Sequence, residues 1–433
     1  MKYYLLQIKQ NIWLVPSLYC VAASLLAFGV IYLDTVHGET IVDIIPAIIL
    51  ISVDLAQTIL GTIAAALLTM ITITFSTIMV VLTTYSTQFS PRTLSDFISN
   101  KVTMRVLGVY MGGIMYSILT LLFMREDLTH EVIAGPIGVL IAIICLAFFA
   151  YFIHHVATNI QVSTLINDVT MTTLKTVKDR ITAKKGEEIK ITSEKPNFPA
   201  GKTAFFHVKN KELGYIQLIE FHHLFKLAKE KDLVIEVKMP IGTFVKPGDI
   251  LITVYYESDS APPFKSKKYI KIGNDRTILQ DVEFGVRKIV EVTLRAISPG
   301  INDPNTAIDC IFHLGKLLAE ASKLDGNYIS YYDNDKGRIV AVQSCFDDVL
   351  YATFYQICHY GRKDISVLLA IYEALIIIAE ENGPSIRKKV WDCSKYIYEN
   401  FDVNHLHEMD LPYLDAKKNR LRELVLDGME GSI

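Results

Sequence analysis

The sequence lacks the short motifs that mark most metal, redox and hydrolytic sites. Its six cysteines show neither C-x-x-C nor zinc-finger spacing, and His222 and His223 lack H-E-x-x-H spacing. Neither G-x-S-x-G nor a P-loop occurs. Neither sign of charge predominates, because the net charge is only −3, and nothing indicates binding to nucleic acid. We therefore expect no enzymatic chemistry, no cofactor, no metal site and no nucleic-acid partner.

The chain is instead rich in hydrophobic residues, and most of them lie in its first part. They make up 51 % of the 433 residues, and the mean hydropathy is +0.31. Four apolar segments are near or above the ~20 residues that cross ~30 Å of hydrocarbon. They are Ile12 to Leu33, Gln57 to Tyr85, Val106 to Phe123 and Val132 to Val156. We predict a transmembrane domain of four helices over residues 1–158, embedded in the lipid bilayer.

Two apolar stretches have alternative interpretations. The first span has an apolar run longer than the 7–15-residue core of a cleaved signal peptide, so we interpret it as a retained helix. Residues 41–53 are also apolar, but Asp43 and Pro46 interrupt them. A short interfacial or re-entrant segment fits this second stretch better than a fifth span.

Basic residues of the short loops fall on one side of this arrangement. They precede the first span, lie between the second and third, and follow the fourth, whereas the other two loops are acidic or mixed. They are Lys2, Lys9, Arg92, Lys101, Arg105, Lys175, Lys178, Arg180, Lys184 and Lys185. Because such residues stay on the cytoplasmic side, we predict that both termini are cytoplasmic.

The second span carries small and hydroxyl side chains on one helical face. At 100° per residue from Asp54 they fall within an arc of roughly 100°, and large aliphatic residues occupy the opposite face. The set is Asp54, Thr58, Gly61, Thr62, Ala65, Thr69, Thr72, Ser76, Met79, Thr83, Thr87 and Ser90. The candidate pore-lining or helix-packing residues, which we call the hydroxyl stripe, are Thr58, Thr62, Thr69, Thr72, Ser76 and Thr83.

Two functions of different class fit this stripe. In the first, several copies assemble and their stripes enclose a path for an ion or small solute, because one stripe per chain cannot surround a pore. A helix from Asp54 to Ser90 would be about 54 Å long and would project beyond the hydrocarbon, so a cytoplasmic sensing region could gate that path. In the second, the protein is a non-conducting membrane-anchored sensor or scaffold, and the stripe only packs helices closely.

The rest of the chain predicts an α+β cytoplasmic region. Residues 159–200 form an amphipathic connecting helix and a linker, and this helix lies either along lipid headgroups or against the soluble region. Residues 201–262 predict a small β-rich subdomain of barrel or sandwich type with a helix inserted at residues 220–231. The segment from Gly242 to Leu251 resembles the turn of a biotinyl/lipoyl-type barrel, although residues 257–262 offer no acceptor lysine.

Residues 263–433 predict a mainly helical subdomain. Two short strands, at residues 329–332 and 338–343, flank the sequence D-N-D-K-G and indicate a hairpin. The helical periodicity predicts helices over residues 277–296, 303–321, 346–359, 365–381, 386–400 and 411–426.

The densest polar signature runs from Ser298 to Thr306. On a structural interpretation, Asp303 caps the next helix, Pro304 takes its first position, and Pro299 and Gly300 make the preceding turn. On a functional interpretation, the helix N-terminus and the upstream arginines receive an anion or a partner subunit. The candidate ligand or interface residues are Arg276, Asp281, Arg287, Asn302, Asp303 and Thr306.

Six ordered blocks of residues resemble a family. They are T-F-S at 74–76 running on to S-T-Q-F-S-P-R at 86–92, F-I-H-H at 152–155, G-Y-I-Q at 214–217, Q-D-x-x-F-G-x-R at 280–287, S-P-G-I-N-D-P-x-T-A at 298–307 and H-Y-G-R at 359–362. Together they resemble the bacterial Domain of Unknown Function 2254 membrane-protein family. The resemblance implies a bacterial inner-membrane protein with an N-terminal helical membrane part and a cytoplasmic C-terminal region, and it implies no reaction.

Overall fold

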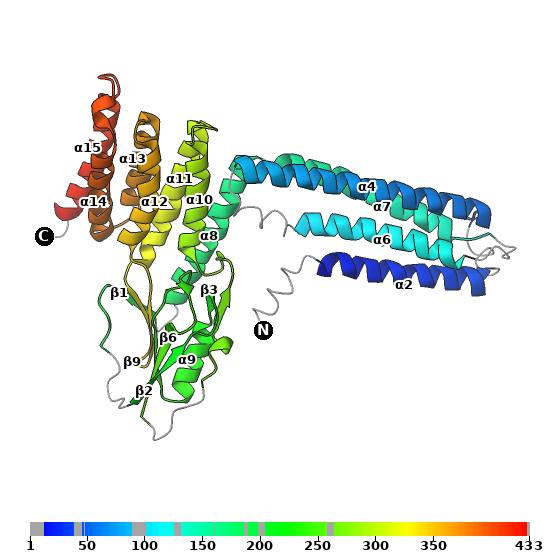
Figure 1. Ribbon diagram of the computed structural model, residues 1–433, viewed down its shortest axis with the longest axis horizontal. Helices are drawn as coiled ribbons and strands as arrows, with labels where there is room; N and C mark the ends of the chain where they lie inside the picture. Colours follow the sequence, from blue (N-terminus) through cyan, green and yellow to red (C-terminus); the bar gives the residue numbers. More distant parts are fainter. Residues whose placement is uncertain are drawn as a thin grey trace. The chain divides into compact units, whose positions relative to one another are not determined.

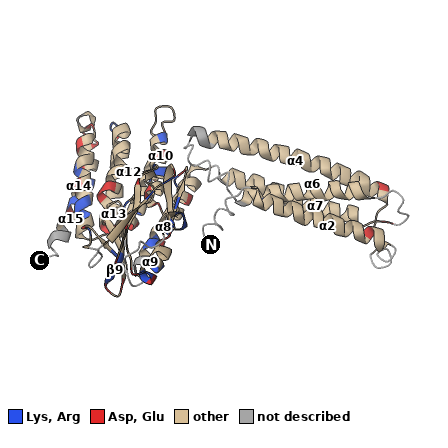
Figure 2. Ribbon diagram, turned by 60° about the horizontal axis from the view of Figure 1, so that its bottom comes forward, with Lys and Arg blue, Asp and Glu red and all other residues tan. Residues whose placement is uncertain are grey.

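The structure, a computed structural model, describes residues 13–38, 46, 48–88, 101–124, 131–159, 161–185, 189–197, 204–257 and 264–430. The chain divides into two compact units, Met1–Gln161 and Val162–Ile433, which we call the membrane unit and the second unit and describe separately (Figure 1). Charged side chains are sparse on the helices of the membrane unit and frequent on those of the second unit (Figure 2).

The membrane unit is built from long apolar helices. They are α2 Leu14–Val36, α4 Val53–Gln88, α6 Lys101–Phe123 and α7 Ala134–Asn159. Among the described residues these four helices are long and apolar enough to cross a membrane, which confirms the four apolar helices that the sequence predicts. Within the 41–53 stretch, residues 41–45 and 47 lie outside the described residues.

Glycines allow these helices to approach one another closely. A Cβ atom on Gly108 of α6 would lie 2.7 Å from the Tyr19 ring of α2, and one on Gly112 would lie 3.3 Å from the Tyr19 carbonyl oxygen. On α7, a Cβ at Gly138 would lie 2.5 Å from the Leu60 side chain of α4. The G-x-x-x-G spacing of Gly108 and Gly112 therefore forms the α2–α6 contact, as small residues do in membrane helices.

Polar contacts join the helices at one end of the membrane unit. The carboxylate of Asp34 on α2 accepts hydrogen bonds from the backbone N–H groups of Ile133 and Ala134, which begin α7. The Tyr116 hydroxyl of α6 donates to the Ala134 carbonyl oxygen over 2.9 Å. Ile51, just before α4, forms an antiparallel bridge with Val132. This end of the bundle is thus fixed by hydrogen bonds as well as by packing.

The second unit combines strands and helices, as the predicted fold class states. Its strands are β1 Ile189–Thr192, β2 Ala204–Lys209, β3 Gly214–Ile219, β4 Val234–Val237, β5 Phe244–Val245, β6 Ile250–Tyr256, β7 Ile270–Gly273, β8 Tyr328–Asp333 and β9 Lys336–Val342. Its helices are α8 Val162–Lys185, α9 Phe221–Glu230, α10 Val282–Ala296, α11 Pro304–Ala321, α12 Phe346–Gly361, α13 Ile365–Glu380, α14 Pro384–Asn400 and α15 Leu411–Glu430.

The described strands form two sheets, and neither is a closed barrel, one of the two forms that the sequence predicts for residues 201–262. The larger sheet has the order β1-β8-β9-β4-β6-β2, and the smaller has the order β5-β3-β7. Strand β4 pairs in parallel with β9, with Ile235 opposite Ile339. Strands β2, β4 and β6 therefore share a sheet with the β8–β9 hairpin, whereas β3 and β5 lie in the smaller sheet with β7, and the barrel expectation is not confirmed.

Helix α8 packs within the second unit through the apolar face that the sequence predicts. Ile166, Val169 and Val177 are buried there, and α8 contacts α10 and α11. The closest approach uses Gly285 of α10, where a Cβ atom would lie 2.1 Å from the Thr173 hydroxyl oxygen. This contact explains the glycine in the Q-D-x-x-F-G-x-R block, because only a residue without Cβ fits against Thr173.

Aspartate side chains cap the first turns of α10 and α11. Helix α10 begins five residues later than predicted, because the Asp281 carboxylate caps it by accepting from the backbone N–H of Phe284. Helix α11 begins at Pro304, as predicted, and Asp303 is its N-cap residue. The predicted hairpin is present as β8 and β9, and its turn residues Asn334 and Asp335 have positive φ angles of 47° and 65°.

Candidate functional site

The hydroxyl stripe lies on the surface of the membrane unit. All six of its residues are exposed. The opposite face of α4 packs against α6 and α7 through Leu60, Leu67, Ile78 and Val81, which are buried. The structure therefore confines the stripe to the side of α4 that contacts no described helix of the same chain. The side chains of Thr87 and Ser90, in the wider set, lie outside the described residues.

The hydroxyls of the stripe are bonded within α4 itself. Five threonines donate to the backbone carbonyl four residues earlier over 2.8–3.0 Å, namely Thr58, Thr62, Thr69, Thr72 and Thr83. Such bonds satisfy the donor and leave the oxygen able to accept. Exposed apolar residues flank the stripe, with Leu55 and Ile73 on one side and Leu68 and Phe75 on the other. The exposed face of α4 is thus a mildly polar band between two apolar edges.

In the second unit, Arg276 and Asp281 are brought together. The guanidinium donates to both carboxylate oxygens, over 2.7 Å from Nε and 2.8 Å from a terminal nitrogen. Both side chains are largely buried. Burial alone lowers the pKa of Arg276, but the Asp281 carboxylate outweighs it and raises that pKa above its ordinary value. The pair also abuts Gly242, whose φ is +84° and where a Cβ would lie 2.2 Å from Asp281 Oδ2.

Asn302, Asp303 and Thr306 form a structural turn and cap, one of the two interpretations of their sequence. Asp303 accepts from the Thr306 backbone N–H over 3.1 Å and from its hydroxyl over 2.6 Å. Asn302 holds a left-handed φ of 51°, and its N–H donates to the Ser298 carbonyl oxygen. Arg287, predicted beside them, is exposed on α10. These contacts support a structural role for the turn.

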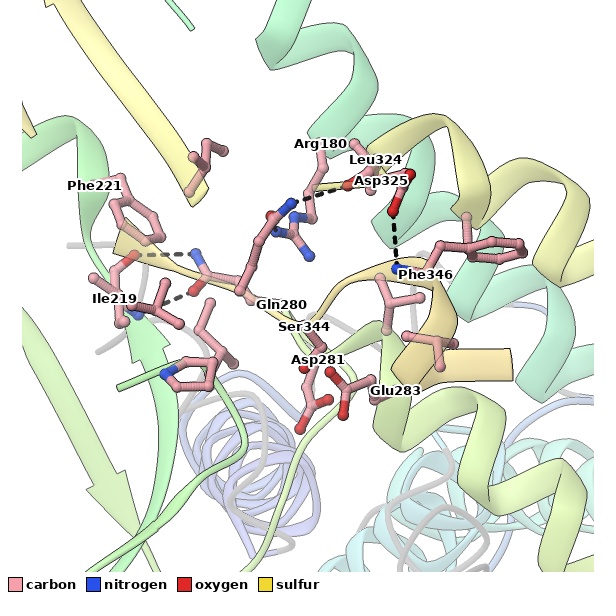
Figure 3. Close-up of a pocket in the computed structure, with 18 residues that line it drawn as sticks. Arg180, Ile219, Phe221, Gln280, Asp281, Glu283, Leu324, Asp325, Ser344 and Phe346 are labelled. Carbon is pink, nitrogen blue, oxygen red and sulfur yellow. Dashed lines mark hydrogen bonds between the residues drawn. The ribbon is translucent and has the colours of Figure 1, made fainter. Parts of the chain in front are cut away.

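A pocket lies at the junction of the sheet and the helices in the second unit, and Asp281 is the one candidate residue that lines it. Its polar lining includes Arg180 of α8, Gln280, Asp281 and Glu283 (Figure 3), together with Gln343, which follows β9. The remaining lining is mostly apolar and includes Ile219, Phe221, Ile241, Leu324 and Phe346. The cavity volume of about 80 Å³ is room for a few water molecules or a small group.

Side-chain hydrogen bonds fix the polar wall of this pocket. Gln280 pairs with the backbone of Ile219, donating to its carbonyl oxygen over 3.2 Å and accepting from its N–H over 3.0 Å. Arg180 donates to the Gln343 side-chain oxygen over 2.9 Å. Burial lowers the pKa of Arg180, while the carboxylates of Asp281 and Glu283 oppose that shift. The pocket therefore contains one guanidinium group together with carboxylates, and apolar side chains form most of the remaining lining.

Sequence reasoning missed most of this pocket. Arg180 is noticeable in the sequence only as one of several basic residues after the fourth span, and Gln343 lies 163 residues away from it. The Q-D pair at 280–281 was the available signal. It begins the Q-D-x-x-F-G-x-R block and directly precedes α10. Within the part of the chain that the structure describes, no group of three His, Cys, Asp or Glu residues could hold a metal ion.

Comparison with known proteins places these features in a family. The family model described as "Predicted membrane protein (DUF2254)" matches residues 9–376. Uncharacterized proteins of Mycobacterium bovis and Mycobacterium tuberculosis are each 26 % identical over 342 residues, which cover 75 % of this chain and 64 % of the relative. The chain thus spans less than two thirds of the length of these relatives, and no solved structure matches it. The family match covers the four apolar helices, the pocket and the turn at Asp303, and the chain belongs to this family of predicted membrane proteins.

Proposed function

We propose that this protein is a homo-oligomeric membrane channel or transport-like protein in which the hydroxyl stripes of several copies face a shared path. The observation that carries the proposal is the exposure of all six stripe residues on a helix whose other face is packed. A band of hydroxyl oxygens that can still accept hydrogen bonds is suited to water or a hydrated solute. Because each chain offers one such band, assembly of several copies is needed to enclose a path.

The length of α4 supports a link between this path and the rest of the chain. The helix has 36 residues and is about 54 Å long, so it exceeds the ~30 Å hydrocarbon core. Helix α7 ends at Asn159 and α8 begins at Val162. This short covalent connection joins the membrane unit to a second unit that holds a pocket with charged and apolar walls. We propose the second unit as a cytoplasmic sensing or gating region of a bacterial inner-membrane protein with both termini inside.

Planar bilayers containing the purified protein test the path directly. We expect Thr72→Leu and Ser76→Leu to reduce conductance, because leucine replaces a hydroxyl on the stripe with a bulky apolar group. Thr77→Leu is the matched control, since Thr77 bonds back to Ile73 in the same way but lies off the stripe. An intact oligomer that conducts nothing under any voltage, pH or osmotic stress contradicts the proposal.

A second candidate function is a non-conducting membrane-anchored sensor or scaffold. The bonds from the threonine hydroxyls to their own helix favour it, because such hydroxyls need no water and can pack against another copy. Cysteine substitutions scanned from residue 58 to residue 83 distinguish the two functions. A wet stripe is labelled by a water-soluble thiol reagent at every third or fourth position, whereas a packed stripe stays unlabelled.

A further inference from the structure

Four hydroxyl groups inside the membrane unit are buried without a hydrogen-bond partner. They belong to Thr74 of α4 and to Thr103, Tyr110 and Thr120 of α6, and we call them the buried hydroxyl row. The exposed fraction of Thr103 is 3 %, and that of each of the other three is 0 %. They are distinct from the hydroxyl stripe, which lies on the exposed face of the same α4 helix.

The unpaired state of Thr74 is not a general property of threonines on α4. Thr72 and Thr77, on either side of it, donate to the carbonyl oxygens of Leu68 and Ile73 over 3.0 Å and 2.9 Å. The Thr74 hydroxyl makes no such bond. The Tyr110 hydroxyl lies next to it across the α4–α6 contact, close enough to interact, but the two do not form a well-aligned hydrogen bond. Two hydroxyl groups therefore face the interior of the bundle without a well-aligned hydrogen-bond partner.

The row extends through most of the membrane depth. Thr103 and Thr120 are 17 residues apart on α6, which corresponds to about 25 Å at 1.5 Å per residue, close to the ~30 Å of hydrocarbon. Ser117 lies seven residues beyond Tyr110 and is also fully buried, with its hydroxyl donating to the Gly113 carbonyl oxygen over 3.0 Å. One face of α6 thus presents hydroxyls at successive depths.

A dry interior does not suit these groups. A buried hydroxyl without a partner destabilises the fold, and buried polar atoms that lack a protein partner are commonly bonded to ordered water. We propose that the buried hydroxyl row binds water molecules, which bridge Thr74 and Tyr110 and pair with Thr103 and Thr120 inside each protomer. This site does not depend on the proposed path between copies, because a protein that conducts nothing can still hold this water.

Hydroxyl-radical labelling by X-ray pulses tests the site on the full-length protein in detergent. Radicals formed from bound water add oxygen to adjacent aromatic rings, even where bulk solvent has no access. Tyr372 of α13 is the control, because it is similarly buried and its hydroxyl is bonded to the Ser394 carbonyl oxygen, away from the row. We expect Tyr110 to be oxidised several times faster than Tyr372 and to carry ¹⁸O when the sample is exchanged into labelled water. Equal rates for the two tyrosines overturn the proposal.

Isosteric substitution gives a second readout. If the site is hydrated, Thr74→Val and Thr103→Val lose the hydrogen bonds to water, and we expect each to lower the thermal unfolding midpoint. If the site is dry, each variant removes an unpaired hydroxyl, and the midpoint stays the same or rises, which overturns the proposal. The control is Thr77→Val, whose hydroxyl is satisfied within α4, and its shift sets the background for losing a threonine hydroxyl from this helix.

Discussion

The carboxylate of Asp34 accepts a hydrogen bond from the backbone N–H of Ala134 over 3.1 Å, across 100 residues of chain. Its other oxygen accepts from Ile133 over 3.1 Å, so one side chain of α2 satisfies two N–H groups at the start of α7. A negative charge is also favourable there because of the helix dipole. In the sequence, Asp34 is only an acidic residue of the loop after the first span, whereas in the structure it is buried and joins two helices.

We therefore expect Asp34→Ala to destabilise the membrane unit by roughly 1–3 kcal/mol, because it leaves buried N–H groups without an acceptor. Thermal unfolding of the full chain in detergent measures the effect. Asp54→Ala is the control, because Asp54 is exposed in the first turn of α4. Equal midpoints for the two variants would show that the Asp34 contact does not stabilise the fold.

How far the sequence predicts this molecule depends on how local each feature is. The hydroxyl stripe follows from helical periodicity alone, and Asp303 as a cap follows from residues within one turn. Thr74 shows the limit, because its hydroxyl is chemically like those of the stripe and only the position of α6 decides that it is buried.

Local sequence patterns do not predict which distant segments pair with each other. The alternation of residues in β4 and β6 predicts strands, but nothing in residues 201–262 indicates that β4 pairs with β9. The contact of Arg180 with Gln343 is likewise not predictable from local sequence, because no motif links the two residues. The barrel alternative is not confirmed for this reason, since a closed barrel requires the strands of one segment to pair among themselves.

The Arg276–Asp281 pair gives a second prediction. Asp281→Ala leaves a largely buried guanidinium unpaired and removes the cap of α10, so we expect a loss of about 3–5 kcal/mol. Asp281→Asn keeps an oxygen for the Phe284 N–H and should lose less. Denaturant unfolding of the full chain compares them, with Asp309→Ala on the exposed face of α11 as control. If Asp281→Asn is as damaging as Asp281→Ala, the cap contributes nothing and the charge alone matters.

Glu236 on β4 gives a prediction about pH. Burial alone raises the pKa of this carboxyl, but hydrogen bonds from Lys195, Lys238 and Tyr255 outweigh burial and hold the pKa below its ordinary value of 4.5. A carboxyl whose pKa is lowered by folding contributes stability that is present above the unfolded pKa and is lost as the pH falls through the folded one. We expect the difference in unfolding midpoint between the wild type and Glu236→Gln to shrink as the pH falls below about 4.5. Parallel pH profiles for the two proteins would contradict this role for Glu236.

The contact between α11 and α13 gives the last prediction. Gly315 of α11 faces the backbone of α13, where an added Cβ would lie 2.8 Å from the Cα of Ala374 and 3.2 Å from its carbonyl oxygen. Backbone atoms in a packed helix cannot move aside as the end of a flexible side chain can, so Gly315→Ala must push the two helices apart. We expect a loss of roughly 1–3 kcal/mol from this overpacking, measured by denaturant unfolding. Gly300→Ala is the control, because a Cβ there meets nothing within 4 Å. If Gly315→Ala is as stable as that control, the α11–α13 packing is looser than this geometry requires.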